Sequence, residues 1–185
     1  MERRKKRYLE IDNYIFKIVK SREEKQLALN FFLKTKFHQM EKSYKNNYLR
    51  SKSYKNFVKK FFLKNYVFIL INKHGKILAC ASCILHNNVL SYVFPAYNPA
   101  YNNFAAGQQL LKHIINQNEL NFKKLDFTIG EERYKQYWSN DEQLLTNSIY
   151  ANNFKGFAYV FFLKLKNKLK NTGFYNYIVK IVRKL

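Results

Sequence analysis

The sequence predicts a mixed α/β fold of the α+β type, in which one central sheet is flanked by helices and followed by a basic helical tail. Strand-like and helix-like segments follow one another in the order β, α, α, β, β, β, α, β, α, β. The 185 residues suffice for one domain with a normal core. Apolar residues make up 47% of the chain and aromatic residues 18%, which argues against wholesale disorder.

The first elements are a strand and a helix. The apolar run Tyr14–Val19 predicts the strand. Ser21 and Glu24 have the spacing of a capping box, in which the side chain of each residue accepts the backbone N–H of the other. They predict a helix that directs Leu27, Phe31 and Phe32 toward the core.

A polar stretch leads to a second helix and then to three strands. Phe and Val alternate with lysines at helical spacing over Ser53–Lys64, which gives this helix a clear apolar face. The strands are predicted at Tyr66–Ile71, Lys76–Leu85 and Val89–Ala96. The first two are joined by the turn Asn72–Gly75, where glycine supplies a positive φ.

Helices and strands are predicted to alternate in the rest of the domain. A helix is predicted to start at Ala105 or Ala106, with its leucines and isoleucines on one side. A strand follows at Lys123–Ile129 and a short helix at Glu131–Trp138. We expect a last strand or strand pair at Glu142–Tyr150.

The two ends of the chain are basic. We expect residues 1–10 to be a flexible basic lead, 11–152 the folded domain, and 153–185 a basic amphipathic helical tail with its main helix at Phe157–Lys170. Aromatic residues mixed with lysines suit an anionic membrane surface. A tail helix packed on the domain, with its lysines merely solvated, is the alternative.

The formal net charge of +22 is extreme for this length. Such a chain attracts phosphate-rich partners, whether nucleic acid, anionic lipid or an anionic cofactor. Lysines outnumber arginines 27 to 7, and Asn, Tyr, Phe and Ile are also abundant, a pattern that an AT-rich genome imposes on any protein. No helix-turn-helix, zinc-finger or RNP-like sequence is present, so specific nucleic-acid binding is not expected.

Cys80 and Cys83 form a C-x-x-C sequence inside an apolar run that is typical of a buried strand. Residues three apart on a strand point to opposite faces, so no shared metal ligand or disulfide is expected. Reduced thiols, the lack of a signal-peptide pattern and the lack of a membrane-spanning apolar run predict a cytoplasmic protein, with peripheral attachment to the inner membrane face as an added expectation.

The most informative segment is Leu125–Trp138, which reads D-F-x-x-G-x-x-x-Y-K-x-x-W from Asp126. This string resembles the C-terminal signature of the acetyltransferase-like family linked to cellulose and exopolysaccharide biosynthesis, a branch of the GNAT superfamily close to the FemAB aminoacyltransferases. The order of elements from residue 14 to 150 is also similar to that of GNAT folds. The resemblance implies a sheet split after its fourth strand, acetyl-CoA or another acyl-CoA as co-substrate, and acyl transfer to an amine or hydroxyl.

The resemblance also implies a pyrophosphate-binding turn between the fourth strand and the following helix. The family pattern Q/R-x-x-G-x-G/A corresponds here to six cofactor-binding candidates: Asn102, Asn103, Ala105, Ala106, Gly107 and Gln108. Small residues stand where close backbone approach needs them, and a helix N-terminus favours an anion. The leading Arg or Gln and the first glycine of the pattern are absent. An ordinary helix start with a permissive Gly107 is the alternative.

Four residues near Gly130 are the catalytic candidates: Asp126, Glu131, Tyr134 and Lys135. Direct acyl transfer needs a base for the nucleophile and a proton donor for the departing thiolate. A carboxylate suits the first role and a tyrosine hydroxyl the second. Purely structural roles are the alternative: Asp126 capping a turn, Lys135 neutralising it, and Tyr134 packing the short helix on the sheet.

The sequence leaves three functions open. The first is an acyl-CoA-dependent N- or O-acyltransferase whose acceptor is a saccharide or a cell-envelope precursor. The second is a GNAT-like binding or assembly module that has lost its cofactor affinity, and the third is a basic nucleic-acid-binding protein. No histidine has the serine or cysteine partner of a catalytic triad, so covalent catalysis of that kind is not expected.

Overall fold

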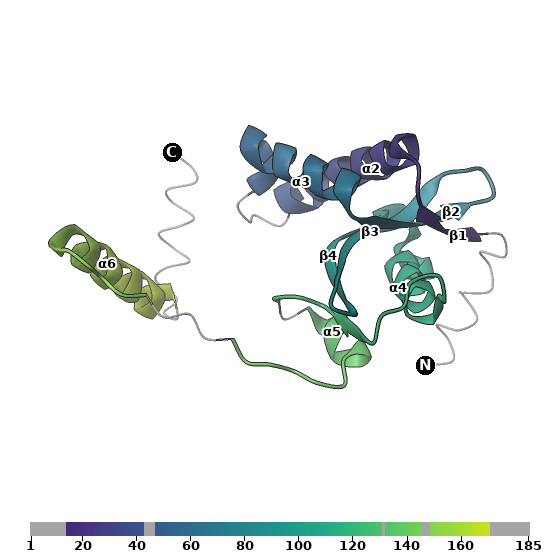
Figure 1. The fold of residues 1–185 in the computed structure, drawn as a ribbon. Helices are drawn as coiled ribbons and strands as arrows, with labels where there is room; N and C mark the ends of the chain where they lie inside the picture. Colours follow the sequence, from purple (N-terminus) through teal and green to yellow (C-terminus); the bar gives the residue numbers. More distant parts are fainter. Residues whose placement is uncertain (1–13, 43–46, 131, 146–148, 171–185) are drawn as a thin grey trace. The chain divides into compact units, whose positions relative to one another are not determined.

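The computed structural model describes residues 14–42, 47–130, 132–145 and 149–170 (Figure 1). The chain divides into two compact units, Met1–Lys135 and Gln136–Leu185, and each is described by itself. The basic lead expected at residues 1–10 lies outside the described residues.

The first unit is built on a five-stranded mixed sheet with the order β1-β2-β3-β4-β5. The strands are β1 (Tyr14–Val19), β2 (Tyr66–Asn72), β3 (Ile77–His86), β4 (Val89–Tyr97) and β5 (Lys124–Asp126). The first four pair antiparallel, and β5 pairs parallel to β4. The predicted mixed sheet flanked by helices is therefore confirmed, with the first four strands close to their predicted positions.

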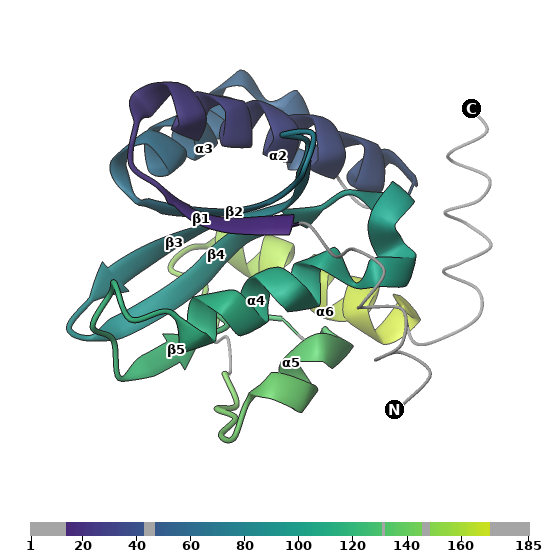
Figure 2. The ribbon, with the colours of Figure 1, turned by 90° about the vertical axis from the view of Figure 1, so that its right-hand side faces the viewer.

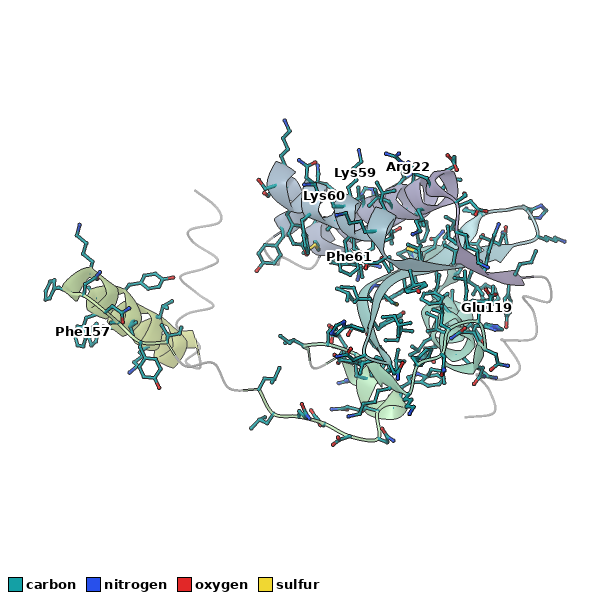
Figure 3. All side chains as sticks on the ribbon, in the orientation of Figure 1. Arg22, Lys59, Lys60, Phe61, Glu119 and Phe157 are labelled. Atoms are coloured by element: carbon teal, nitrogen blue, oxygen red, sulfur yellow. The ribbon has the colours of Figure 1, made fainter. Side chains whose placement is uncertain are left out.

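Two long helices, α2 (Arg22–Lys42) and α3 (Lys52–Lys64), cover one face of the sheet, and α4 (Ala106–Asn116) covers the other (Figures 1 and 2). Short 3-10 helices, η1 (Tyr48–Arg50) and η2 (Pro99–Phe104), precede α3 and α4. In Figure 3, Arg22, Lys59 and Lys60 point outward from α2 and α3 into solvent, as their exposure requires.

Side-chain caps fix where α2 and α3 begin. The backbone N–H of Glu24 donates to the Ser21 hydroxyl at 3.2 Å, and the Glu24 carboxylate accepts from Ser21 in return, which confirms the capping box. Glu24 also pairs with Lys17 of β1. At α3, the hydroxyl of Ser51 accepts from the N–H of Tyr54 at 3.4 Å.

The main core lies between α2, α3 and the sheet. Phe94 of β4 meets rings from both helices, with centroids 5.5 Å from Phe32 and 4.8 Å from Phe61. The prediction for Leu27 is wrong, because its side chain is 61% exposed, while Ala28, Leu29 and Phe32 are the buried residues of α2. Apolar residues fall on almost every side of α2, so the pattern alone does not select the buried face.

A β-bulge divides β4. Ser82 pairs with Phe94 and Cys83 pairs with Tyr92, so Val93 is the extra residue on β4. Cys80 and Cys83 are buried free thiols, and burial raises the pKa of both. The residues that the structure describes contain no cluster of three or more His, Cys, Asp or Glu side chains suited to a metal ion.

The short helix α5 (Arg133–Trp138) begins in the first unit, and α6 (Phe154–Lys170) belongs to the second. The Asn153 side chain accepts the N–H of Gly156 at 2.7 Å and so caps α6. The strand expected at Glu142–Tyr150 is wrong, because residues 142–145 and 149–150 have no strand structure. None of the described helices combines the length and apolar character that crossing a bilayer requires.

Candidate active site

The sheet opens between β4 and β5. Their parallel pairing covers only three residue pairs, from Val89 with Lys124 to Ser91 with Asp126. Beyond these pairs β4 continues through Tyr97, while the chain after Asp126 leaves the sheet in a turn. The C-terminal ends of two parallel strands therefore diverge, and such diverging ends are a common ligand-binding position in open α/β sheets.

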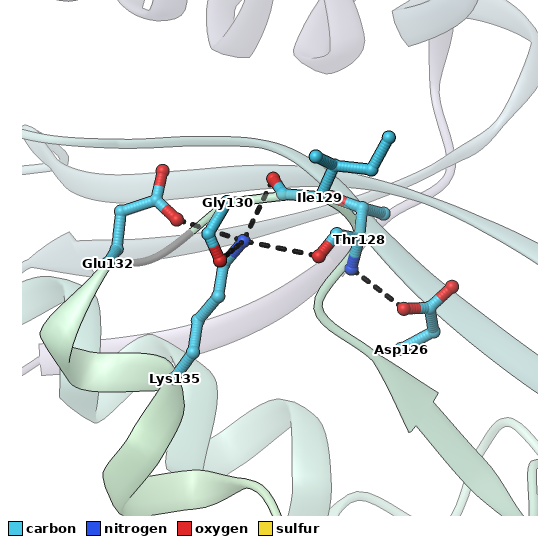
Figure 4. Close-up of polar contacts among 6 residues, drawn as sticks. All are labelled: Asp126, Thr128, Ile129, Gly130, Glu132 and Lys135. Atoms are coloured by element: carbon cyan, nitrogen blue, oxygen red, sulfur yellow. Dashed lines mark hydrogen bonds and ion pairs between the residues drawn. The ribbon is translucent and has the colours of Figure 1, made fainter. Parts of the chain in front are cut away.

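Lys135 holds the turn that follows β5 (Figure 4). Its ammonium group donates to the carbonyl oxygens of Thr128, Ile129 and Gly130 at 3.3, 3.1 and 3.4 Å. It also forms an ion pair with Glu132 at 2.9 Å. Lys135 is only 9% exposed, so these contacts satisfy an otherwise costly buried charge.

Two further features fix the shape of the turn. Oδ1 of Asp126 accepts the N–H of Thr128 at 2.7 Å, which is an Asx-turn. Thr128 has φ +58° and Gly130 has φ +136°. A Cβ at Gly130 would lie 2.4 Å from a carboxylate oxygen of Glu132, and the φ of Gly130 lies in a region that L side chains rarely adopt, so glycine is favoured here. Asp126 thus has the local role of shaping the turn.

Glu132 lies between two lysines. Partial burial raises the pKa of its carboxyl, but the hydrogen bond from Lys135 and the charges of Lys135 and Lys36 outweigh that effect and lower it. The ion-pair partner of Lys135 is therefore Glu132, where the structural alternative expected Asp126.

Tyr134 ends a short chain of aromatic rings. Its ring meets Phe127 edge-on at 6.0 Å, and Phe127 meets Tyr92 of β4 edge-on at 6.2 Å. Burial, followed by the charge of Glu132, raises the pKa of Tyr134 to about 12. Its hydroxyl therefore stays protonated, and remains a hydrogen-bond donor, at neutral pH.

The start of α4 lies at the end of β4. A Cβ at Gly107 would be 3.4 Å from the Tyr97 ring, so the missing side chain allows close approach. Ala105 adopts a left-handed conformation, with φ 47° and ψ 43°, and its carbonyl accepts the N–H groups of Gln108 and Gln109. The N–H groups of Ala106 and Gly107 have no acceptor within the helix, because helices leave their first amides unpaired.

Some predicted site residues are not placed. Glu131 lies outside the described residues. Asn102 and Asn103 belong to η2, but their side chains also lie outside what the structure describes. Of the remaining candidates, the structure brings Asp126, Tyr134 and Lys135 together around the turn, and it gathers the others at the start of α4.

The sequence analysis did not single out Glu132 or Lys36 of α2, and Lys36 is the more distant of the two in sequence. It is partly buried, and burial lowers the pKa of its ammonium group, with the charge of the Glu132 carboxylate acting in the opposite direction. The available signal was its spacing, since Lys36 lies four residues after Phe32 and so interrupts the apolar stripe of α2.

Comparisons with solved structures agree with this architecture. A protein from Pyrococcus furiosus assigned as an acetyl transferase is 12% identical, with a TM-score of 0.50 over 72% of this chain and 99% of that one. A GNAT-family acetyltransferase from Staphylococcus aureus Mu50 is 19% identical, with a TM-score of 0.40 over 55% of this chain. That match covers 64% of the S. aureus chain, which is less than two thirds of its length.

An aminoglycoside acetyltransferase from an uncultured soil metagenomic sample, solved with sisomicin, is 13% identical, with a TM-score of 0.47 over 77% of this chain and 98% of that one. Of these three, only the Pyrococcus furiosus structure reaches a TM-score of 0.50, and at 12% identity it bears on the fold alone. The search of curated proteins finds no match. The family model described as an acetyltransferase (GNAT) domain matches residues 1–136. With its split mixed sheet and a family match over most of its length, the chain belongs to the GNAT acetyltransferase domain family.

Proposed function

We propose that this protein is an acyl-CoA-dependent acyltransferase that transfers an acyl group directly to an amine or hydroxyl. The supporting observation is the opening between β4 and β5, with the α4 N-terminus at one side and the Asp126–Lys135 segment at the other. A thioester in this opening would lie between amides suited to phosphate and side chains suited to proton transfer.

The residues at the start of α4 fit the pyrophosphate of acyl-CoA. The amides of Ala106 and Gly107 have no acceptor inside α4, and the helix dipole favours an anion there. A left-handed alanine costs about 1 kcal/mol relative to glycine, yet Ala105 keeps that conformation. This left-handed residue stands where the family pattern has its first glycine, which supports the proposed cofactor turn.

Tyr134 is the proposed proton donor for the thiolate. The acceptor nitrogen or oxygen forms a bond to the acyl carbon, the carbon–sulfur bond breaks, and the sulfur takes the Tyr134 proton. A carboxylate removes the proton of the nucleophile, and Glu131 or the neighbouring Glu132 has that chemistry. Asp126 and Lys135 act by shaping the turn that carries these groups.

The acceptor is proposed to be a saccharide or a cell-envelope precursor. The supporting feature is the D-F-x-x-G-x-x-x-Y-K-x-x-W string, which resembles the family linked to cellulose and exopolysaccharide biosynthesis and to FemAB-like enzymes. Such acceptors lie near membranes, and α6 presents exposed aromatic side chains beside lysines. We propose that residues 153–185 attach the protein peripherally to an anionic membrane.

Calorimetric titration with acetyl-CoA and longer acyl-CoAs tests the cofactor site. Gly107→Trp fills the contact with Tyr97 and blocks the free amides, so we expect saturable binding in the native protein and at least a tenfold weaker binding in this variant, equivalent to about 1.4 kcal/mol. Asn116→Trp makes the same addition at the exposed far end of α4 and should bind normally.

Salt must be matched throughout this titration, because the net charge of +22 attracts any polyphosphate. If the native protein binds acyl-CoA no better than the nonspecific background, the proposal fails. The chain would then be the binding or assembly module that the sequence left open.

A further inference from the structure

Lys36 occupies a position that an apolar side chain would normally fill. It lies about one helical turn beyond Phe32 on the same side of α2, and Phe32 contacts Phe94 of β4. One turn further along, the Gln39 amide donates to the carbonyl of Tyr97 at 3.5 Å. Lys36 therefore lies over the C-terminal half of β4, which is the half beyond its pairing with β5.

The charges around Lys36 are unbalanced. The positive charges of Lys36 and Lys135 both lower the pKa of the Glu132 carboxyl, but only Lys135 forms an ion pair with it. The other group near Lys36, the Cys80 thiol, is neutral because burial raises its pKa. Within the described residues Lys36 makes no hydrogen bond or ion pair, and the carboxylate whose charge acts on it, that of Glu132, is already paired with Lys135.

An unpaired, partly buried ammonium group costs folding free energy. A methionine would fill the same space on this apolar stripe without that cost. Charged groups held in such unfavourable positions within clefts are candidates for ligand binding, because an anion entering the cleft supplies the missing partner.

We propose that Lys36 determines acceptor specificity by binding a carboxylate or phosphate group that the acyl acceptor carries near its reacting amine or hydroxyl. This inference rests on the proposed acyltransferase function and names the class of acceptor. The acceptor enters from the α2 side of the opening, its anionic group pairs with Lys36, and α4 on the opposite face of the sheet is left to the acyl-CoA.

Three amino sugars test which anionic group Lys36 binds. Glucosamine has no anionic group, glucosamine 6-phosphate carries a phosphate, and muramic acid carries a carboxylate. Their binding is measured by calorimetry on the full chain and on Lys36→Met. The matched control is Lys34→Met, which removes an equal charge from an exposed position on the same helix. Acetyl-CoA is titrated into all three proteins.

We expect one of the two anionic sugars to bind at least about tenfold more tightly than glucosamine, as a charge-assisted hydrogen bond provides. Lys36→Met should remove that preference while keeping acetyl-CoA affinity, and Lys34→Met should keep both. Preference for the phosphate or for the carboxylate identifies the anion. Equal binding of all three sugars, no saturable binding of either anionic sugar, or an unchanged preference in Lys36→Met overturns the inference.

Thermal unfolding gives a second readout that a structural role would not produce. Lys36→Met should melt at a higher temperature than the native protein, since it replaces an unpaired charge by an apolar side chain. A lower melting temperature than that of Lys34→Met would show that Lys36 supports the fold, and would overturn the inference. Failure of acetyl-CoA to bind the native protein would contradict the proposed function, while the anion preference would still report on Lys36.

Discussion

At the scale of single residues, the turn after β5 depends on one ammonium group. Lys135 gathers the carbonyl oxygens of three successive residues, Thr128 to Gly130, and ties them to Glu132. Three neighbouring carbonyls that point at one cation leave the rest of the turn little freedom. Lys135 shapes the turn in this arrangement, and Tyr134 beside it is the proton donor that we propose.

Lys135→Met should therefore destabilise the first unit. The carbonyls lose a charged donor within a mostly buried setting, which we expect to lower the free energy of unfolding by about 2 kcal/mol. Urea denaturation followed by circular dichroism measures the change. Lys60→Met, an equal loss of charge at an exposed position of α3, should stay within about 0.5 kcal/mol of the native protein. Equal stability of the two variants would rule out this role of Lys135.

The sequence predicted which residues gather at the site better than it predicted what each does. Asp126, Tyr134 and Lys135 could be grouped because they lie within one short motif. Their bonding could not, since the sequence alone suggested Asp126 as the partner of Lys135. The structure instead pairs Lys135 with Glu132, three residues away, and turns the chain at Thr128 and Gly130 through positive φ values. Lys36 is distant in sequence, and no local pattern connects it to this motif.

At the scale of elements, α4 is joined to β1 through a histidine. The His113 ring stacks on Phe16 at 5.2 Å and meets Tyr14 edge-on, and its Nε2 lies 3.3 Å from the Tyr14 hydroxyl. Burial, followed by the charge of Lys112, lowers the pKa of His113 from its ordinary value of 6.5. The folded protein therefore favours the neutral ring.

This contact gives a pH dependence with a definite sign. Below pH 6.5 the unfolded chain takes up the His113 proton more readily than the folded protein does, so stability falls as pH drops from 6.5 toward the lowered pKa. His113→Phe keeps the stacking and removes the titration. Its unfolding free energy should be flatter across this window in urea titrations at successive pH values. Parallel curves for the two proteins would contradict the assignment.

The predicted positions of the strands agree with the structure for some strands and not for others. Strands β2 to β4 have apolar cores and turn residues at both ends, so their positions were predictable. β5 was predicted to reach Ile129 but ends at Asp126, where the Asx-turn replaces strand hydrogen bonds. The apolar residues of the segment at 142–150 suggested a strand, yet Leu144 is 92% exposed. Alternating hydrophobicity identifies candidates for pairing, but a partner strand must also be available.

At the scale of the whole molecule, exposed aromatic side chains concentrate in the second unit. Phe154, Phe157 and Phe161 follow helical spacing along one side of α6, and each is more than 60% exposed. Lys155 and Lys164 are exposed on the same helix. This combination of apolar and basic groups, in a chain of net charge +22, is what an anionic lipid surface binds.

Co-sedimentation with phosphatidylserine-containing vesicles at low salt tests this attachment. We expect the native protein to pellet with anionic vesicles and to remain in solution with phosphatidylcholine alone. Phe157→Ser should weaken the partitioning about tenfold or more, because it removes a large apolar contact. Phe57→Ser, the same change at an exposed site on α3, should bind as the native protein does. No pelleting of the native protein would exclude the tail as a membrane anchor.

The short pairing of β5 with β4 also bears on the order in which the fold forms. β2, β3 and β4 are neighbours in sequence joined by tight turns, whereas β5 reaches its partner only after the whole of α4. Closing that larger loop costs more conformational entropy, and only three residue pairs between β4 and β5 offset this cost. The opening that we propose for acyl-CoA is therefore completed by the shortest strand pairing of the described sheet. A variant can keep a normal melting transition while losing this contact, so amide hydrogen exchange at Leu125, rather than global stability, reports whether the site is assembled.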